Sequence, residues 1–227
     1  MPHTKKLPKT TRTPKPDALA RARAGFVNQV VFWVNGKRVA LQNPEPRLLL
    51  VDYLRSADVG LTGTKIGCKE GGCGACTVIL SHWDRQSKNI VHNAINSCLR
   101  PVASLDGACI TTIEGIGSTQ TQLNEFQEKI AAGNGSQCGF CTPGFVMSRY
   151  CVELTEPDSG AQHIENNLDG NLCRCTGYYP IMRAFGACAP TQGPEPVVRE
   201  RGELKPAAVE VKPPNTAAIG FQIPSRG

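Results

Sequence analysis

The sequence lacks a long hydrophobic run, because no stretch of 18 or more consecutive apolar residues occurs in its 227 residues. A helix that crosses a bilayer needs about 20 such residues, so we predict no membrane span. Aromatic residues make up only 6% of the chain and hydrophobic residues 40%, and the second share is somewhat below the globular average. Part of the chain is therefore expected to stay outside the packed core.

An excess of one charge is also missing from the body of the chain. The net charge of +6 arises in residues 1–26, which hold seven Lys or Arg and one acidic residue, while the rest of the chain carries 18 bases and 18 acids. A nucleic-acid-binding surface needs a clustered basic patch. We therefore predict no nucleic-acid partner for the folded part.

Residues 1–26 lack the continuous apolar stretch and the small-residue cleavage site of a secretory signal peptide. They also lack an Arg-Arg pair, since Ala22 separates Arg21 and Arg23. We expect a basic flexible tail here and a cytoplasmic location, with periplasmic export left open.

Residues 190–227 contain seven prolines and are predicted to form a second, Pro-rich tail, because such a segment cannot bury enough apolar surface to fold.

Between the tails, residues 27–116 have the pattern of an α+β domain. A run rich in β-branched and aromatic residues meets Asn35-Gly36, which predicts a hairpin with a return strand at about 37–41. The spacing of leucines predicts a helix over residues 47–56. Further strands are predicted over residues 77–81, 88–96 and 108–116.

Residues 117–189 are expected to be all-α. Pro143 and Pro180 stand where a first-turn proline is favoured. Helices are predicted over residues 123–132, 143–154, 163–170 and 179–188.

The eleven cysteines all lie in these two central regions, and four of them form a recognisable set in the first. The stretch GCKEGGCGACTVIL contains a C-x4-C-x2-C triplet, and a fourth cysteine follows after 21 residues. This is the spacing of plant-type [2Fe–2S] ferredoxins, and the interspersed glycines allow the backbone to wrap closely round a cluster. The predicted iron ligands are Cys68, Cys73, Cys76 and Cys98.

Disulfide bonds and structural zinc are two other uses of these four thiols. Disulfides suit small secreted domains, whereas this chain shows no secretion signal and enough apparent core. Structural zinc favours two C-x2-4-C knuckles, whereas this region has a triplet and one distant cysteine. The iron–sulfur interpretation is favoured, with zinc as the alternative.

The second region contains another set of four, in SQCGFC and NLCRC. The pattern is C-x2-C, 31 residues, then C-x-C, and two cysteines so close are awkward ligands for one tetrahedral zinc ion. A two-iron cluster can give each iron two thiolates, although the spacing does not show which cysteines share an iron. The predicted ligands are Cys138, Cys141, Cys173 and Cys175, again with zinc as the alternative.

The combination GCKEGGCGACTVIL, NSCL, SQCGFCTPGFVMS and GNLCRCTGYYP resembles the iron–sulfur subunit or domain of the molybdenum hydroxylases, the xanthine dehydrogenase and aldehyde oxidase family. The resemblance covers about residues 27–189. It implies a β-grasp plant-type ferredoxin domain over 27–116 and an all-α four-helix [2Fe–2S] domain over 117–189.

By resemblance, the chain is the electron-transfer subunit of a multi-subunit oxidoreductase that oxidises an aldehyde or an N-heterocycle. Electrons would pass from molybdopterin on a large subunit through two [2Fe–2S] clusters to FAD on a medium subunit, or to another acceptor. The resemblance implies that the 138/141/173/175 set lies nearest the molybdenum and that Gln137 and Cys175 contact the pterin. It implies no catalytic residue on this chain.

Two other functions remain open at this point. The chain could be a stand-alone double-cluster ferredoxin, or a zinc-stabilised interaction module. The remaining cysteines fit none of these sites: Cys109 and Cys151 are expected to be buried small hydrophobic residues, and Cys188 could be exposed.

Overall fold

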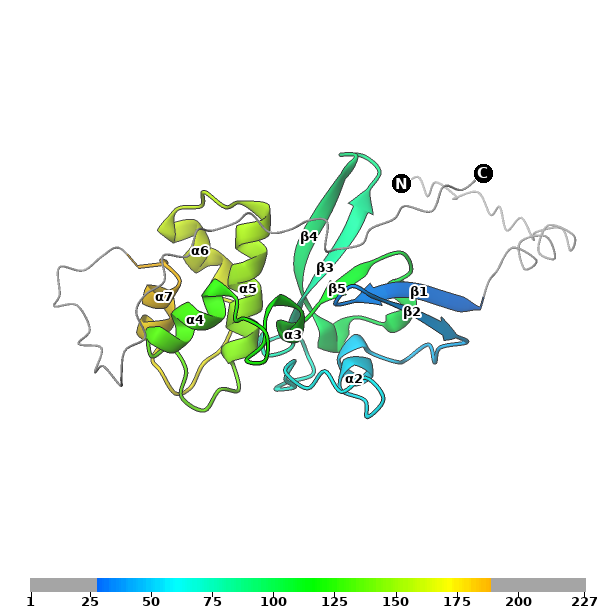
Figure 1. Ribbon diagram of the computed structural model, residues 1–227, viewed down its shortest axis with the longest axis horizontal. Helices are drawn as coiled ribbons and strands as arrows, with labels where there is room; N and C mark the ends of the chain where they lie inside the picture. The colour runs from blue at the N-terminus through cyan, green and yellow to red at the C-terminus, as the bar shows by residue number, and fades with distance from the viewer. Residues whose placement is uncertain (1–27, 189–227) are drawn as a thin grey trace, which may run out of the picture.

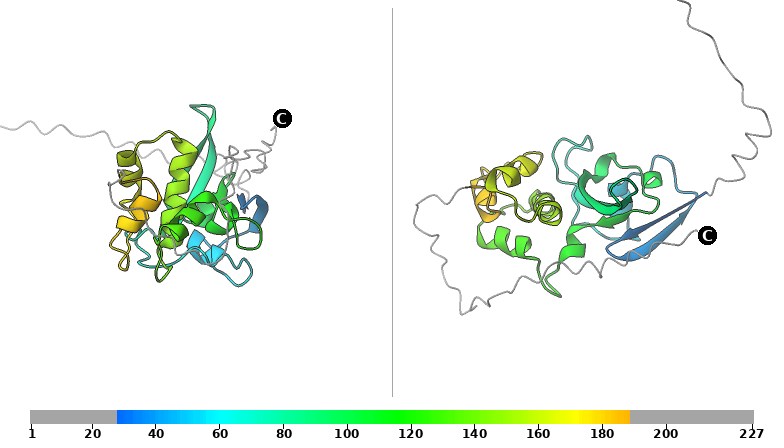
Figure 2. Two further views of the ribbon diagram at one scale, coloured as in Figure 1. Left: turned by 60° about the vertical axis from the view of Figure 1, so that its left-hand side comes forward. Right: turned by 90° about the horizontal axis from the view of Figure 1, so that it is seen from above.

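The computed structural model describes residues 28–188, so the two predicted tails lie outside the described residues. A mixed five-stranded sheet forms one side of the molecule and a group of helices the other, and Figures 1 and 2 show the two groups side by side. Within the described residues no helix is long and apolar enough to cross a membrane.

The first two strands form the predicted hairpin. Strand β1 (Gln29–Val34) pairs antiparallel with β2 (Lys37–Gln42), and Asn35 and Gly36 between them have φ of 49° and 78°. A two-residue turn with positive φ at both positions matches the twist of the strands. Val30, Phe32 and Val34 alternate toward the core.

The sheet order is β2-β1-β5-β3-β4. Strand β3 (Thr77–Asp84) pairs antiparallel with β4 (Asn89–Asn96) and with β5 (Cys109–Thr111), while β1 and β5 run parallel. The predicted strands at 77–81 and 88–96 are thus confirmed.

Helix α2 (Leu50–Leu54) crosses the sheet and is shorter than the predicted 47–56. Leu49 instead forms an isolated bridge with Pro101, and the Leu50 N–H donates to the Arg100 carbonyl at 2.8 Å, so the chain is extended before the helix. Leu50 and Leu54 join the sheet core, and each such burial contributes about 1.5–3 kcal/mol.

The strand predicted over 108–116 was wrong in its second part. Strand β5 ends at Thr111, and residues Ile113–Ile116 form the short helix α3. Strand β1, which pairs with β5, ends at the hairpin turn. The Thr112 N–H therefore donates to the Asn35 side chain, at 2.9 Å, instead of to a neighbouring strand. The chain therefore leaves the sheet at this point.

All four predicted helices of the second region are present, with ends shifted by a few residues. Asn124 caps α4 by accepting the Phe126 N–H at 3.0 Å, and prolines occupy the first turns of α5 and α7 as predicted. Helix α7 stops before Gly186, whose φ of 74° ends a helix. The bounds are α4 (Glu125–Ala132), α5 (Thr142–Thr155), α6 (Ala161–Leu168) and α7 (Tyr179–Ala184).

Helix α5 joins the two groups. It packs on β3 and β4, where Met147 and Cys151 form a buried cluster with Ile79 of β3. Its other side, which includes Phe145, packs in the helical core with Phe126 of α4 and Ile181 of α7. Two hydrophobic cores are therefore joined by one shared helix.

Two 3-10 turns, Ser97–Leu99 (η1) and Val102–Ser104 (η2), complete the described structure.

Candidate metal centres

The first set of cysteines gathers around the loop between α2 and β3. Cys68 and Cys73 lie in the glycine-rich loop, Cys76 directly precedes β3, and Cys98 lies in the 3-10 turn Ser97–Leu99 after β4. Cys76 and Cys98 are buried and pack against Val51 of α2. The fold thus brings the distant fourth cysteine to the triplet.

The four thiols of this set meet as two pairs. Cys68 contacts Cys73, and Cys98 contacts Cys76 and interacts electrostatically with Cys68. The backbone N–H of Glu70 donates to the Cys68 sulfur at 3.4 Å and, as the largest cause, lowers the pKa of Cys68 to about 7. Burial, together with the Cys76 thiol, raises the pKa of Cys98 to about 11.

The second set gathers between α4 and α7. Cys138 and Cys141 lie just before α5, with Cys141 at its N-cap, and Cys173 and Cys175 lie in the loop between α6 and α7. This set also forms two pairs: Cys138 contacts Cys175, and Cys141 contacts Cys173. The first pair is exposed, whereas Cys173 is buried and Cys141 half-buried.

The pKa shifts of the thiols in the second set also differ in direction. Burial and the Cys173 thiol raise the pKa of Cys141 to about 12, even though a helix N-terminus favours a thiolate. The pKa of Cys173 is lowered: burial, the largest single effect, raises it, but hydrogen bonds with Thr176, the Cys175 backbone and the Cys141 thiol together outweigh that effect. Contact with Cys138 raises the pKa of Cys175.

The donor sets fit a two-iron cluster better than a single metal ion. A tetrahedral zinc site needs four donors around one point. Each set instead offers two thiol pairs, and a [2Fe–2S] cluster takes two ligands on each iron. The loop backbone also lies tightly against one of the thiols, because a Cβ on Gly67 would lie only 2.8 Å from the Cys73 sulfur.

The other predicted site residue, Gln137, lies on the surface next to the exposed pair formed by Cys138 and Cys175. Tyr178 accepts a hydrogen bond from the Cys173 N–H at 3.0 Å and packs its ring edge-on against Phe145. Cys109 and Cys151 are buried as predicted, and burial raises the pKa of both. Cys188 is partly buried.

Sequence reasoning did not identify the residues that join the loops of the two cysteine sets. Leu172 donates its N–H to the Cys73 carbonyl at 3.0 Å, and Asn171 and Ser148 form a buried hydrogen-bonded pair beside it. A serine inside the apolar run FVMSRY was the one available signal, since a buried hydroxyl needs a partner.

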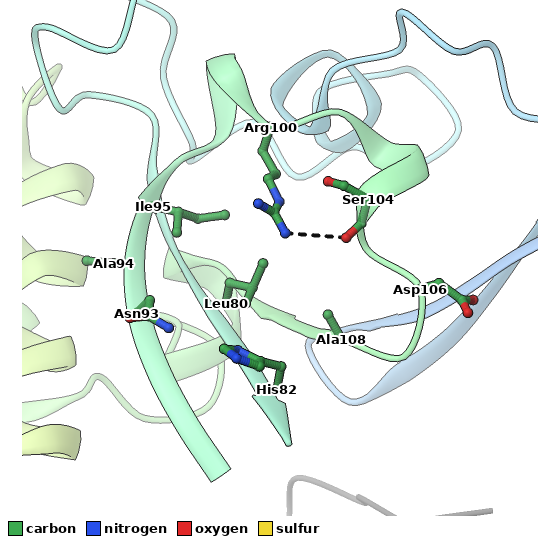
Figure 3. A pocket seen from close by; sticks show the side chains of 9 residues that line it. All are labelled: Leu80, His82, Asn93, Ala94, Ile95, Arg100, Ser104, Asp106 and Ala108. Carbon is green, nitrogen blue, oxygen red and sulfur yellow. Dashed lines mark hydrogen bonds between the residues drawn. The ribbon is translucent and has the colours of Figure 1, made fainter. Parts of the chain in front are cut away.

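A cavity of about 530 Å³ on the sheet side contains none of the eight predicted ligands. Figure 3 shows Arg100 reaching toward the Ser104 carbonyl, at 3.3 Å, with His82 on a neighbouring wall. Arg100 Nε and His82 Nδ1 are buried there without a hydrogen-bond partner in the described part of the chain. Its lining offers no thiol, so the candidate metal centres lie elsewhere.

Comparison with known proteins agrees with this geometry. A family model described as "2Fe-2S iron-sulfur cluster binding domain" matches residues 32–103, and one described as "[2Fe-2S] binding domain" matches residues 112–186. A chain of quinoline 2-oxidoreductase from Pseudomonas putida 86 is 35% identical with a TM-score of 0.60, and the match covers 70% of this chain and 90% of that one. The chain belongs to the iron–sulfur part of the molybdenum hydroxylase family.

Longer members of this family contain the same part. Xanthine dehydrogenase/oxidase of Felis catus is 53% identical over 158 residues, which are 70% of this chain and 12% of that protein. Aldehyde oxidase 3 of Mus musculus is 49% identical over 164 residues, with 72% and 12% covered. The chain therefore spans about one eighth of the length of these curated relatives.

An aldehyde oxidoreductase from Desulfovibrio gigas is 37% identical with a TM-score of 0.61, and the match covers 70% of this chain and 16% of that one. The molybdenum hydroxylase fold of this part is thus shared between long and short chains.

Proposed function

We propose that this chain is the electron-transfer part of a molybdenum hydroxylase that oxidises an aldehyde or an N-heterocycle. One cluster would be held by Cys68, Cys73, Cys76 and Cys98, and the other by Cys138, Cys141, Cys173 and Cys175. When bound, each [2Fe–2S] cluster supplies one-electron redox chemistry. The chain would hold the two clusters in series between a molybdopterin centre and FAD, both on partner subunits or domains.

The observation that carries this proposal is a backbone hydrogen bond that joins the loops of the two cysteine sets. Leu172 directly precedes Cys173, and its N–H donates to the carbonyl of Cys73 at 3.0 Å. A ligand of each set thus lies at either end of a short bonded path. Electron transfer between two clusters requires a short path between their sites, whereas a zinc-stabilised interaction module requires no such path.

The exposure of the second set supports its place beside the pterin. Cys138, Cys175 and Gln137 are exposed, and the large apolar side chains of Phe140 and Leu172 in the same loops are 46% and 56% exposed. Exposed apolar residues beside a functional site are typical of a surface that a partner covers. We propose that the molybdopterin-binding subunit docks here, and that Gln137 and Cys175 contact the cofactor.

Several finer points belong to the same proposal. We infer a β-grasp ferredoxin domain over residues 27–116 and a four-helix domain over 117–189. We expect a cytoplasmic enzyme, because reducing conditions keep closely spaced thiols free for iron. The FAD-binding partner would meet the first set of cysteines.

The proposal is tested by purifying the tagged chain from its own cells and analysing what accompanies it. We expect a large molybdenum-containing chain to copurify, and the visible absorbance of the clusters to bleach when an aldehyde or purine substrate is added. Recovery of an iron-loaded monomer alone would contradict the subunit role and favour a stand-alone double-cluster ferredoxin.

A further inference from the structure

Asn171, which lies two residues before Cys173, is a buried polar residue with both ends of its amide engaged. It is 4% exposed. Its amide oxygen accepts the Ser148 hydroxyl at 2.7 Å, and its amide nitrogen donates to the Gly74 carbonyl at 3.1 Å. Gly74 lies in the loop between Cys73 and Cys76, so this side chain ties the loop of one cysteine set to the loop of the other.

The contact has two parallel hydrogen bonds. The Asn171 side chain donates to the Gly74 carbonyl, and the N–H of the next residue, Leu172, donates to the carbonyl of Cys73. We call this pair of bonds the loop clasp. The Leu172 bond uses only backbone atoms, so Asn171 is the part of the clasp that depends on a side chain.

Steric crowding keeps the clasp in one arrangement. A Cβ on Gly74, whose φ is +69°, would lie 2.5 Å from the Asn171 amide nitrogen and 2.7 Å from the Gly170 carbonyl oxygen. A Cβ on Gly144 of α5 would lie 2.3 Å from the Gly74 carbonyl oxygen. The two loops therefore approach as closely as their backbones allow.

The geometry points to Asn171 as a positioning residue for electron passage between the two cysteine sets. Held by Ser148, its amide fixes the separation of the clusters bound there. Electron tunnelling weakens exponentially with distance, so the separation sets the rate of transfer. This inference rests on the proposed function, and it adds a residue that binds no iron and touches no substrate.

Asn171→Asp is the most direct test, because it preserves the size of the side chain. It replaces the amide donor with a carboxylate oxygen that faces the Gly74 carbonyl, and two acceptors cannot share a hydrogen bond. Loss of a buried hydrogen bond of this kind shifts the ratio of clasped to open loops by about tenfold. The matched control is Asn167→Asp, which adds the same charge to an exposed residue whose amide bonds only the His163 carbonyl of its own helix.

Two readouts on the full-length chain with its copurifying subunits report the separation. One is the dipolar splitting between the EPR signals of the two reduced clusters, which falls with the inverse cube of their distance. The other is the rate of electron equilibration between the clusters after flash reduction by a photoreduced flavin. Iron content and the two reduction potentials show whether each site is intact.

We expect Asn171→Asp to keep both EPR signals while its splitting decreases and equilibration becomes slower than in the unsubstituted protein. Ser148→Ala, which removes the donor that holds the amide, should change both readouts in the same direction to a smaller extent. Asn167→Asp should match the unsubstituted protein.

Equal splitting and equal rates in Asn171→Asp and Asn167→Asp would overturn the positioning role and leave the proposed function intact. If Asn171→Asp fails to incorporate both clusters, Ser148→Ala decides, and unchanged splitting in that variant overturns the inference. Absence of two cluster signals from the unsubstituted protein would instead overturn the proposed function.

Discussion

Hydrogen-bond donors lower the pKa of one thiol in each cysteine set. Cys68 receives the Glu70 N–H, and Cys173 lies 3.1 Å from the Thr176 hydroxyl, and in both cases the pKa is lowered. Their neighbours Cys98 and Cys141 are shielded from water, and burial raises the pKa of both. Since iron binds thiolates, loading each site must release the protons that these buried thiols hold.

Gly67 gives a sharp prediction about the first set. Gly67→Ala would place a methyl group 2.8 Å from the Cys73 sulfur, so that sulfur must move away from its partner. We expect the purified variant to lose about half of its iron, because one of the two sites is affected. Iron analysis with cysteine titration provides the measurement.

Gly72→Ala is the matched control for this prediction. It lies in the same loop, and a Cβ there would meet nothing within 4 Å. Equal iron content in the two variants would show that the space beside Cys73 is not needed for a cluster.

At the scale of elements, the turn between β1 and β2 is fastened to the start of α3. Asn35 donates from its amide to the Thr112 hydroxyl and accepts the Thr112 N–H, both at 2.9 Å. Asn35→Ala loses both bonds and places alanine at a φ of 49°. We expect the free energy of unfolding in urea to fall by about 2–4 kcal/mol.

Asn43→Ala separates the effect of the positive φ from the effect of the lost hydrogen bonds. Asn43 has a similar φ of 46°, but its side chain is exposed and makes no hydrogen bond within the described part of the chain. Its loss should be limited to the backbone cost of about 1 kcal/mol. A loss as large as that of Asn35→Ala would contradict the fastening role.

Arg149 holds α5 against the other helices. It is 8% exposed, its guanidinium lies 4.4 Å from the centre of the Phe126 ring, and it pairs with Glu153 at 3.1 Å. Arg149→Met leaves Glu153 and the Phe185 carbonyl without this donor, and we expect about 2–3 kcal/mol less stability in urea.

Lys129→Met tests a surface version of the same contacts. Lys129 lies 5.2 Å from the Phe126 ring centre and 3.3 Å from Glu125, but it is half-exposed. An exposed pair of this kind contributes less than about 1 kcal/mol, so the change should be small. A similar loss in both variants would show that burial of Arg149 adds nothing.

Most elements could be predicted because their signals are local. Asn35-Gly36 fixed the hairpin, and Pro143 and Pro180 marked two helix starts. The end of β5 could not be predicted, because it depends on the contact between Thr112 and Asn35 across 77 residues. The pairing of Cys138 with Cys175 was also beyond reach, since chain spacing does not report which loops face each other.

For the whole molecule, the central feature is that two cysteine sites belong to one packed body. Helix α5 begins at the second site and packs on the sheet that carries the first, through Met147, Cys151 and Ile79. Figure 1 shows this helix between the sheet and helices α4, α6 and α7. The loop clasp adds a second connection beside the thiols, so the separation of the sites is built into the fold.

This account depends most directly on the metal content of the chain. The measurement is iron, acid-labile sulfide and zinc analysis of the purified full-length protein, combined with low-temperature EPR after dithionite reduction. We predict about four irons per chain and two distinct rhombic signals, one from each cluster. Stoichiometric zinc with no EPR signal would contradict the electron-relay function and support the zinc-stabilised module.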